Sequence, residues 1–126
     1  MNLITGATGH IGNVMVRQML ARGNKVRAFL LPGEDCHSLD GLDVEQVDGN
    51  VLNLDSLRYA FRDVDVVYHL ASLVTLISGK QDLVRRVNVD GTRNVLQAAR
   101  EMGVRRVVYT SSIHALGRPP MDVIID

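Results

Sequence analysis

The sequence has 126 residues, which is the usual size of one compact domain and too short for two. Hydrophobic residues make up 46% and charged residues 22% of the chain, a balance typical of globular proteins, so an intrinsically disordered chain is excluded. Fourteen basic residues balance fourteen acidic ones, and this zero net charge argues against nucleic acid or an anionic membrane as a partner.

The cysteine content and the start of the chain favour a soluble, cytoplasmic protein. Cys36 is the single cysteine, so no internal disulfide can form, which is typical of a reducing compartment. The first residues lead directly into a glycine-rich stretch, without the basic and apolar segments of a signal peptide. No apolar run approaches the roughly 20 residues that span a bilayer, so no membrane association is expected.

Short apolar runs alternate with longer amphipathic stretches, which is the pattern of an α/β protein with a parallel sheet. Each short run has the length and composition of a strand that is buried on both faces. Five strands are predicted, over residues 2–5, 25–31, 43–47, 64–70 and 106–110.

Three helices are predicted between these strands. The first begins near His10, has apolar residues at three- and four-residue spacing, and ends at Gly23. Asn53 is predicted to be the N-cap of a short second helix. A long third helix is predicted over residues 81–102, with Gly103 at its end. The connection between the second and third strands is predicted to be a loop.

These elements predict one domain over residues 1–126, a three-layer parallel α/β sheet of the Rossmann type. Right-handed crossovers between parallel strands favour the strand order 3-2-1-4-5. Such a sheet has a topological switch point beside its first strand, and ligands bind in the crevice at that point.

Residues 5–12, Thr-Gly-Ala-Thr-Gly-His-Ile-Gly, join the first strand to the first helix. Gly6 allows a sharp turn, Gly9 lets the backbone approach a pyrophosphate, and Gly12 allows the helix to pack closely. The helix N-terminus adds free N–H groups and a partial positive charge. A tight turn without a ligand would use the same glycines, but the flanking strand and helix favour dinucleotide binding.

Four motifs carry a resemblance to a known superfamily. They are the glycine loop, with its three-residue glycine spacing, and the segments 65–71, 88–95 and 109–112. In this order they closely resemble the extended short-chain dehydrogenase/reductase superfamily, which includes NAD-dependent epimerases and dehydratases and reductases similar to dihydroflavonol reductase. The resemblance covers nearly the whole chain. It implies an NAD(P)-dependent oxidoreductase or epimerase that moves a hydride between nicotinamide and a secondary alcohol or ketone of a small-molecule substrate.

The resemblance also implies a set of cofactor-binding residues. Asn50 falls where many relatives carry an aspartate that accepts a hydrogen bond from the adenine amino group. His69 is interpreted as a hydrogen-bonded structural residue rather than a catalytic one. Asn88 is expected to tie the third helix to the fourth strand, and Gly91 predicts a close approach to that helix. The implied cofactor-binding residues are Gly6, Thr8, Gly9, His10, Ile11, Gly12, Asn50, Val51, Leu70, Ala71, Ser72 and Asn88.

Ser112 matches the family's catalytic serine or threonine, whose expected role is to hydrogen-bond the reacting carbonyl or hydroxyl. The alternative is a pair of serines that simply leaves the fifth strand. The family's proton-transfer pair is a tyrosine and a lysine four residues apart, and none of the three tyrosines here has such a lysine. The chain is therefore expected to be truncated after the fifth strand, without the catalytic helix and the substrate-binding portion, and to bind cofactor without turnover on its own.

The end of the second strand carries neither of the usual features that distinguish NAD from NADP. A carboxylate there would bind the ribose diol of NAD, and an arginine would favour the phosphate of NADP, but the strand ends in Leu31. Glu34 and Asp35 follow closely and favour NAD, while Arg27 lies within the strand and is expected to point elsewhere. NADP is the alternative cofactor.

Two other functions are compatible with the sequence. A dinucleotide-sensing regulatory protein without turnover is favoured by the missing tyrosine and lysine pair. A phosphate-binding module unrelated to nicotinamide is disfavoured by the four motifs. In relatives the helix similar to 81–102 often packs across a two-fold interface, so a homodimer is also expected. No metal site is predicted.

Overall fold

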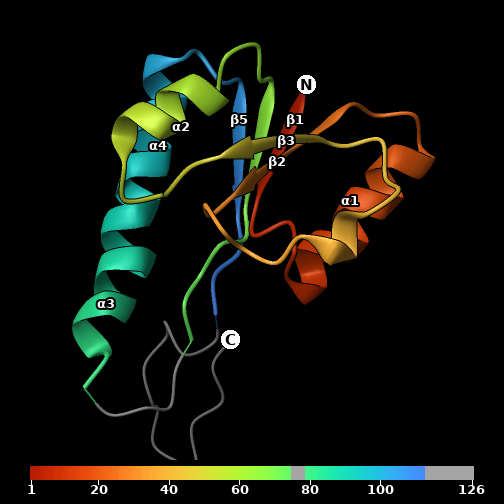
Figure 1. Cartoon of the computed structure of the whole chain (residues 1–126). Coiled ribbons are helices and arrows are strands. Elements are labelled where there is room, and N and C mark those ends of the chain that lie inside the picture. The colour runs from red at the N-terminus through yellow and green to blue at the C-terminus, as the bar shows by residue number, and fades with distance from the viewer. Residues whose placement is uncertain (75–78, 113–126) are drawn as a thin grey trace, which may run out of the picture.

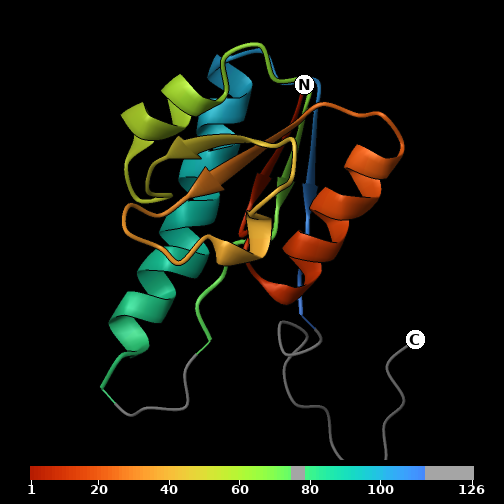
Figure 2. The same cartoon turned by 45° about the vertical axis from the view of Figure 1, so that its right-hand side comes forward.

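The computed structural model of the chain describes residues 1–74 and 79–112. It contains a five-stranded parallel sheet with the order β3-β2-β1-β4-β5, which is the predicted order. The strands lie side by side with β1 in the middle (Figures 1 and 2). Their bounds are β1 Asn2–Thr5, β2 Val26–Leu30, β3 Glu45–Asp48, β4 Val66–His69 and β5 Arg106–Tyr109.

Helices cover both faces of this sheet and complete three layers (Figures 1 and 2). One face carries α1 (His10–Ala21). The other face carries α2 (Leu54–Ala60) and a long helical stretch that consists of α3 (Gln81–Arg85), the π-helical segment η2 (Arg86–Gly91) and α4 (Thr92–Glu101). The arrangement confirms the predicted Rossmann-type α/β fold.

Side chains that alternate along the central strands form two apolar cores, one on each face of the sheet. Leu3 and Val67 belong to the core that includes residues of α2 and α4, whereas Ile4 and Ala28 belong to the core that includes Val16 of α1. Successive residues of a strand point to opposite faces, so both cores anchor the same strands. The carboxyl ends of these strands are thereby held in fixed positions.

The two edge strands contradict the prediction that every strand is buried on both faces. Three of the four β3 residues are exposed, and in β5 Val108 and Tyr109 are 38% and 51% exposed. Each edge strand pairs with one neighbour only among the described residues, so an apolar composition alone overestimates burial. The fourth strand is also shorter than the predicted range 64–70, because its pairing with β1 ends at His69.

Two helical details differ from the sequence prediction. The stretch predicted as one regular helix contains the π-helical segment η2, a feature frequently found at functional sites. A Cβ atom on Gly91, at the end of η2, would lie 2.8 Å from Cγ2 of Val51, which explains the glycine as a close-approach position. The connection between β2 and β3, predicted to be a loop, contains a short 3₁₀ helix, η1 (His37–Leu39), which buries Leu39.

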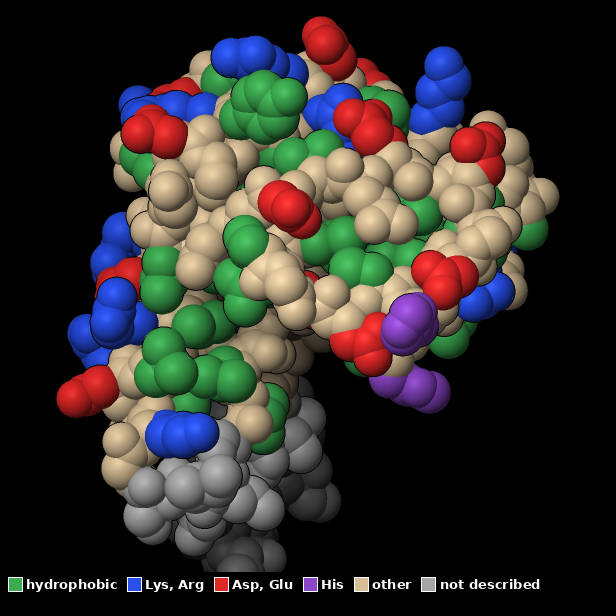
Figure 3. Space-filling view, viewed as in Figure 1, with side chains coloured by type: hydrophobic (Ala, Val, Ile, Leu, Met, Phe, Trp, Pro, Cys, Tyr) green, Lys and Arg blue, Asp and Glu red, His purple; other side chains and the backbone are tan. Residues whose placement is uncertain are grey.

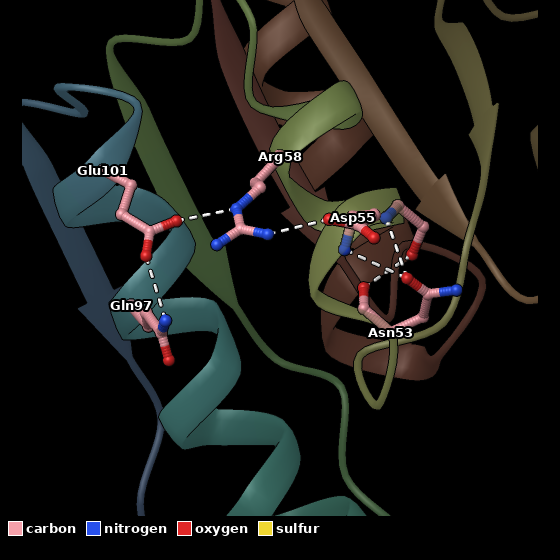
Figure 4. A network of polar contacts seen from close by, with 6 residues as sticks. Asn53, Asp55, Arg58, Gln97 and Glu101 are labelled. Carbon is pink, nitrogen blue, oxygen red and sulfur yellow. Dashed lines mark hydrogen bonds and ion pairs between the residues drawn. The ribbon is translucent and has the colours of Figure 1, made fainter.

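A polar network joins α2 to α4 (Figure 4). Asn53 caps α2 as predicted, because its side-chain oxygen accepts the backbone N–H groups of Asp55 and Ser56 at 3.0 and 3.1 Å. Arg58 donates to the carboxylates of Asp55 and of Glu101 on α4, both at 2.7 Å. The hydrogen bond from Arg58 lowers the pKa of the Glu101 carboxyl. The network holds the two helices together on one face of the sheet.

Candidate functional site

A cleft of about 860 Å³ lies at the carboxyl ends of the strands, between the glycine loop and the helical stretch that begins with α3. It adjoins the boundary between β1 and β4, the topological switch point of this strand order. The surface in Figure 3 is recessed between the part of the molecule that carries α3 and the part that carries α1. Hydrophobic side chains gather over α3 beside this recess.

The cleft brings together most of the residues that the sequence assigns to the site. Ser112, the predicted catalytic residue, lines it. Asn88 is the one predicted cofactor-binding residue outside the lining. The other eleven line it: Gly6, Thr8, Gly9, His10, Ile11, Gly12, Asn50, Val51, Leu70, Ala71 and Ser72.

Several lining residues were not assigned to the site from the sequence. Leu73 follows the fourth strand, and its position just beyond Ser72 was a usable signal. Leu83 and Val87 fit the apolar stripe of a helix equally well as core residues, so nothing in the spacing marked them as cleft residues. Glu34, which the sequence indicates only as a group that favours NAD, also lines the cleft. The remaining unassigned lining residues are Phe29, Leu31, Gly49, Leu52, Tyr109, Thr110 and Ser111.

The glycine loop is closed by contacts that only glycine permits. Gly6 has a positive φ of 73°, and a Cβ atom there would lie 2.8 Å from the backbone nitrogen of Ala71. A Cβ atom on Gly12 would lie 2.0 Å from the carbonyl oxygen of Gly6, so the first turn of α1 packs directly on the loop. A side chain at either position would displace backbone and fill the turn.

The N-terminus of α1 has the features of an anion site. Gly9 is its N-cap and supplies no side chain to accept the N–H groups of the first turn, and that turn contains no acidic residue. These N–H groups and the positive end of the helix dipole therefore remain available to an anionic group in the cleft.

Glu34 lies at the cleft beside the glycine loop. Its carboxylate accepts the backbone N–H of Leu31 at 2.8 Å and the hydroxyl of Thr8. The turn that brings it there has Gly33 at a positive φ of 78°. Arg27 points away as expected, because its guanidinium donates to the carbonyl of Ala60 at 2.6 Å. At this end of the second strand, Glu34 therefore places a carboxylate at the cleft, whereas the neighbouring Asp35 does not line it.

Asn50 and Val51 form the wall of the cleft after β3. The side-chain oxygen of Asn50 accepts the backbone N–H of Leu52 at 2.9 Å, and its backbone N–H donates to the hydroxyl of Ser56 at 3.1 Å. The carbonyl of Val51 accepts the side-chain amide of Asn94 from α4 at 3.0 Å. These bonds fix the backbone of this wall against both helices.

His69 is buried beneath the cleft and bonded at both ring nitrogens. Its Nδ1 lies 2.8 Å from Oγ1 of Thr5, and its Nε2 lies 3.0 Å from Oγ1 of Thr92. Its ring stacks on Tyr109, with ring centroids 5.6 Å apart. Burial lowers the pKa of His69 to about 4, so the imidazole is neutral at pH 7.

Asn88, which lies in η2, ties the helical stretch to the loop after β4. Its side-chain amide donates to the carbonyl of Leu73 at 2.9 Å, and its side-chain oxygen accepts the N–H of the same residue at 2.8 Å. Both ends of the amide are therefore used on one backbone position. Asn88 supports the cleft from behind through Leu73, which lines it.

Ser111 and Ser112 follow β5 after a single intervening residue, Thr110. Tyr109, the last residue of β5, is in register with His69, the last residue of β4, so the two chains leave the sheet side by side. The serines therefore emerge next to the segment that contains Ala71. Residues 113–126 lie outside the described part of the chain.

A metal-ion cluster and a membrane-spanning helix are both absent from the described ranges 1–74 and 79–112. No cluster of three or more His, Cys, Asp or Glu side chains suited to a metal ion occurs there. None of the helices in these ranges has the length and apolar character needed to traverse a lipid bilayer.

Sequence comparison gives matches along almost the whole chain. The profile of the 3-beta hydroxysteroid dehydrogenase/isomerase family matches residues 3–125. Sterol demethylase protein B of Methylococcus capsulatus is 48% identical over 118 residues, which cover 94% of this chain and 36% of the relative. Cinnamoyl-CoA reductase 1 of Oryza sativa subsp. japonica is 41% identical over 98% of this chain and 38% of the relative. The chain thus spans little more than a third of the length of these relatives.

Structural comparison gives a match with a bound dinucleotide. A short-chain dehydrogenase/reductase superfamily protein from Agrobacterium tumefaciens, crystallised with NAD, matches with a TM-score of 0.79 and 32% identity. The match covers 97% of this chain and 36% of that one. The fold of this chain therefore occurs in a protein that holds a nicotinamide dinucleotide.

Proposed function

The chain belongs to the 3-beta hydroxysteroid dehydrogenase/isomerase family, and from this premise we propose that its cleft is the NAD-binding site of a short-chain dehydrogenase/reductase. The membership confirms the resemblance predicted from the four sequence motifs. For the whole protein we propose hydride transfer between nicotinamide and a secondary alcohol or ketone of a small-molecule substrate.

The observation that carries the proposal is the backbone cradle formed by the glycine loop. Side chains at Gly6 and Gly12 would collide with backbone, and α1 begins without a capping side chain. These features fit a pyrophosphate, which needs close backbone approach and free N–H groups. We place the adenosine ribose at Glu34 and the adenine at Asn50 and Val51, and the nicotinamide end beside the loop after β4.

Within this proposal Ser112 acts on the reacting oxygen. The bound cofactor supplies or accepts the hydride. The hydroxyl of Ser112 would donate a hydrogen bond to the carbonyl oxygen as charge develops on it. A serine is too weak an acid at neutral pH to deliver the proton alone, and no tyrosine of the sequence is followed four residues later by lysine. We therefore propose that this 126-residue polypeptide binds cofactor without turnover.

Parallel fluorescence titrations with NADH and NADPH test the cofactor site. We expect saturable NADH binding and NADPH binding that is weaker by about tenfold, because the Glu34 carboxylate repels a phosphate on the ribose. Tenfold tighter NADPH binding would overturn the preference for NAD. Failure of both nucleotides to bind would overturn the site itself.

A non-catalytic dinucleotide sensor is the second candidate function. Such a sensor would use the same cleft to bind the dinucleotide without turnover, whereas Ser112 at the cleft favours the enzyme. A turnover assay with ketone substrates, on protein verified by intact mass, separates inactivity from activity of the chain itself. Substantial carbonyl reduction by this polypeptide would exclude both the sensor and the proposal of binding without turnover. A cytoplasmic location and a homodimer complete the proposal.

A further inference from the structure

A network of buried and partly buried hydrogen bonds runs beneath the floor of the cleft, with His69 at its centre. The imidazole lies 2.8 Å from the hydroxyl of Thr5 and 3.0 Å from the hydroxyl of Thr92. The hydroxyl of Thr5 also accepts the backbone N–H of Ala71 at 3.2 Å. The hydroxyl of Thr92 donates to the backbone carbonyl of Asn88 at 2.7 Å. These hydrogen bonds therefore connect Thr5, at the end of β1, to Asn88 in η2.

The directions of the hydrogen bonds on both sides of His69 follow from the single hydroxyl proton of Thr92. Thr92 has a single hydroxyl proton and donates it to Asn88, so its oxygen accepts the proton on Nε2 of His69. The neutral ring then has its acceptor at Nδ1, which takes the hydroxyl proton of Thr5. Loss of one link would leave a buried neighbour without its partner, so the links depend on one another.

Both ends of this hydrogen-bond network reach residues that line the cleft. At one end Ala71 packs on the glycine loop, since a Cβ atom on Gly6 would lie 2.8 Å from its nitrogen. At the other end the side chain of Asn88 holds both backbone groups of Leu73. The ring of Tyr109, which also lines the cleft, stacks on the imidazole.

We propose that His69 is a positioning residue that couples the two ends of the cofactor cleft, because the hydrogen bonds to Thr5 and Thr92 make the placement of the glycine loop depend on the placement of η2. The proposal rests on the proposed function, in which the cleft binds a dinucleotide. If His69 only filled the core, it would support the glycine loop and η2 independently of each other. Coupling instead requires that a change at Thr92 alters binding at the glycine loop.

Two probes separate the ends of the cleft in an affinity measurement. ADP-ribose carries the adenosine and pyrophosphate but no nicotinamide, whereas NADH reaches both ends. Thr92→Val keeps the shape of the side chain and removes its hydroxyl. We expect this variant to bind ADP-ribose about three- to tenfold more weakly than the wild type, the effect of losing one hydrogen-bonded link.

The variant His69→Asn tests whether the effect of Thr92 on the glycine loop passes through His69. Its shorter amide can retain the contact with Thr5 but cannot reach Thr92. When Thr92→Val is added to His69→Asn, we expect no further loss of ADP-ribose affinity, because the link is already broken. Val67→Ala is the matched control, since it shortens a buried β4 residue of the apolar core. This variant should lower stability and leave ADP-ribose affinity unchanged.

An ADP-ribose affinity of Thr92→Val within twofold of the wild type overturns the coupling, and so does an equal further loss in the His69→Asn background. If the wild type binds neither ADP-ribose nor NADH, the proposed function fails. Amide hydrogen exchange then tests whether the glycine loop and η2 are coupled. Thr92→Val must then accelerate exchange at the Ala71 amide several-fold beyond the Val67→Ala control. An unchanged exchange rate overturns the proposal.

Discussion

At the scale of single residues, the chemistry of the cleft depends on two side chains whose surroundings constrain them. His69 is almost fully buried, and burial alone lowers its pKa to about 4. Glu34 is held by the hydroxyl of Thr8 and the N–H of Leu31. His69 is therefore a neutral structural group near pH 7, and the carboxylate of Glu34 is held in position by two hydrogen bonds.

The first prediction concerns the stability that the neutral state of His69 provides. An unfolded histidine has a pKa of 6.5, so between pH 6.5 and pH 4 the unfolded state takes up a proton that the folded state does not. Stability is fully present above pH 6.5 and is lost as the pH falls toward 4. The free energy of unfolding should fall by about 3 kcal/mol from this group over that range.

Denaturant unfolding at pH 7 and pH 4, on the wild type and His69→Asn, measures this loss. The carboxylates titrate in both proteins, so the difference between them isolates the histidine. The wild type should lose about 3 kcal/mol more than the variant. Equal losses in the two proteins would show that the histidine is not protected from protonation.

The second prediction concerns Glu34 as the residue that distinguishes NAD from NADP. Glu34→Gln removes the charge and keeps the size, so NADPH should gain relative to NADH by about tenfold in parallel titrations. Asp35→Asn is the matched control, because that carboxylate accepts the N–H of His37 at 3.0 Å and does not line the cleft. A preference that survives Glu34→Gln, or changes equally in the control, contradicts the assignment.

The sequence was informative about residues whose role is local and less so about residues brought together by a turn. Gly6 could be predicted from the sharp turn, where its φ is 73°, and Gly12 from its close approach to Gly6 within the same loop. The contact between Thr8 and Glu34 could not, because it depends on the path of the turn at Gly33. Glu34 was a candidate only by its distance from the strand end.

At the scale of elements, caps and spacing predict where helices begin but not how regular they are. The N-cap at Asn53 was predicted from residue type and position, and the structure confirms it. The π-helical segment η2 was not predicted, because its apolar residues also fit the spacing of a regular helix. What distinguishes it is tertiary contact, including the tie between Asn88 and Leu73.

The third prediction tests the cap of α2. Asn53→Ala removes the acceptor for the N–H groups of Asp55 and Ser56, and it should lower the free energy of unfolding by about 1 kcal/mol. Asn53→Asp, which retains a capping oxygen, should restore most of that stability. Denaturant unfolding of the two variants measures the difference. Equal stability of the alanine and aspartate variants would show that the cap contributes nothing.

Strand burial was predicted well at the centre of the sheet and poorly at its edges. Apolar runs correctly indicated β1, β2 and β4, which have neighbours on both sides. The same kind of run indicated β3 and β5, yet most of their residues are exposed. Composition reports that a strand can be buried, whereas its position in the sheet decides whether it is.

At the scale of the whole molecule, the three layers place the glycine loop, the second-strand turn and the serines after β5 around one cleft. These segments are distant in sequence, and the parallel sheet collects them because all its strands end on the same side. The outer surface also leaves apolar side chains exposed along the long helical stretch, among them Val89 at 44% and Leu96 at 50%. Such exposure favours self-association.

The fourth prediction is that the chain associates through this helical stretch. Leu96→Asp places a charge on the exposed face and should shift the protein toward the monomer in light scattering across a concentration series. Val14→Ser is the control, because Val14 is equally exposed on α1, on the opposite face of the sheet. A wild type that remains monomeric at high concentration, or a control with the same effect as Leu96→Asp, contradicts the prediction.

The fifth prediction concerns the central claim that this cleft binds a nicotinamide dinucleotide. Mapping amide chemical shifts during an NADH titration tests this claim most directly. We predict saturable shifts at the amides of Gly6, Gly9, Asn50 and Ala71, which line the cleft from three separate segments of the chain. The amide of Lys25, which lies at the amino end of β2 and outside the cleft lining, should not move. Absence of saturable shifts, or shifts centred away from the cleft, would contradict the claim.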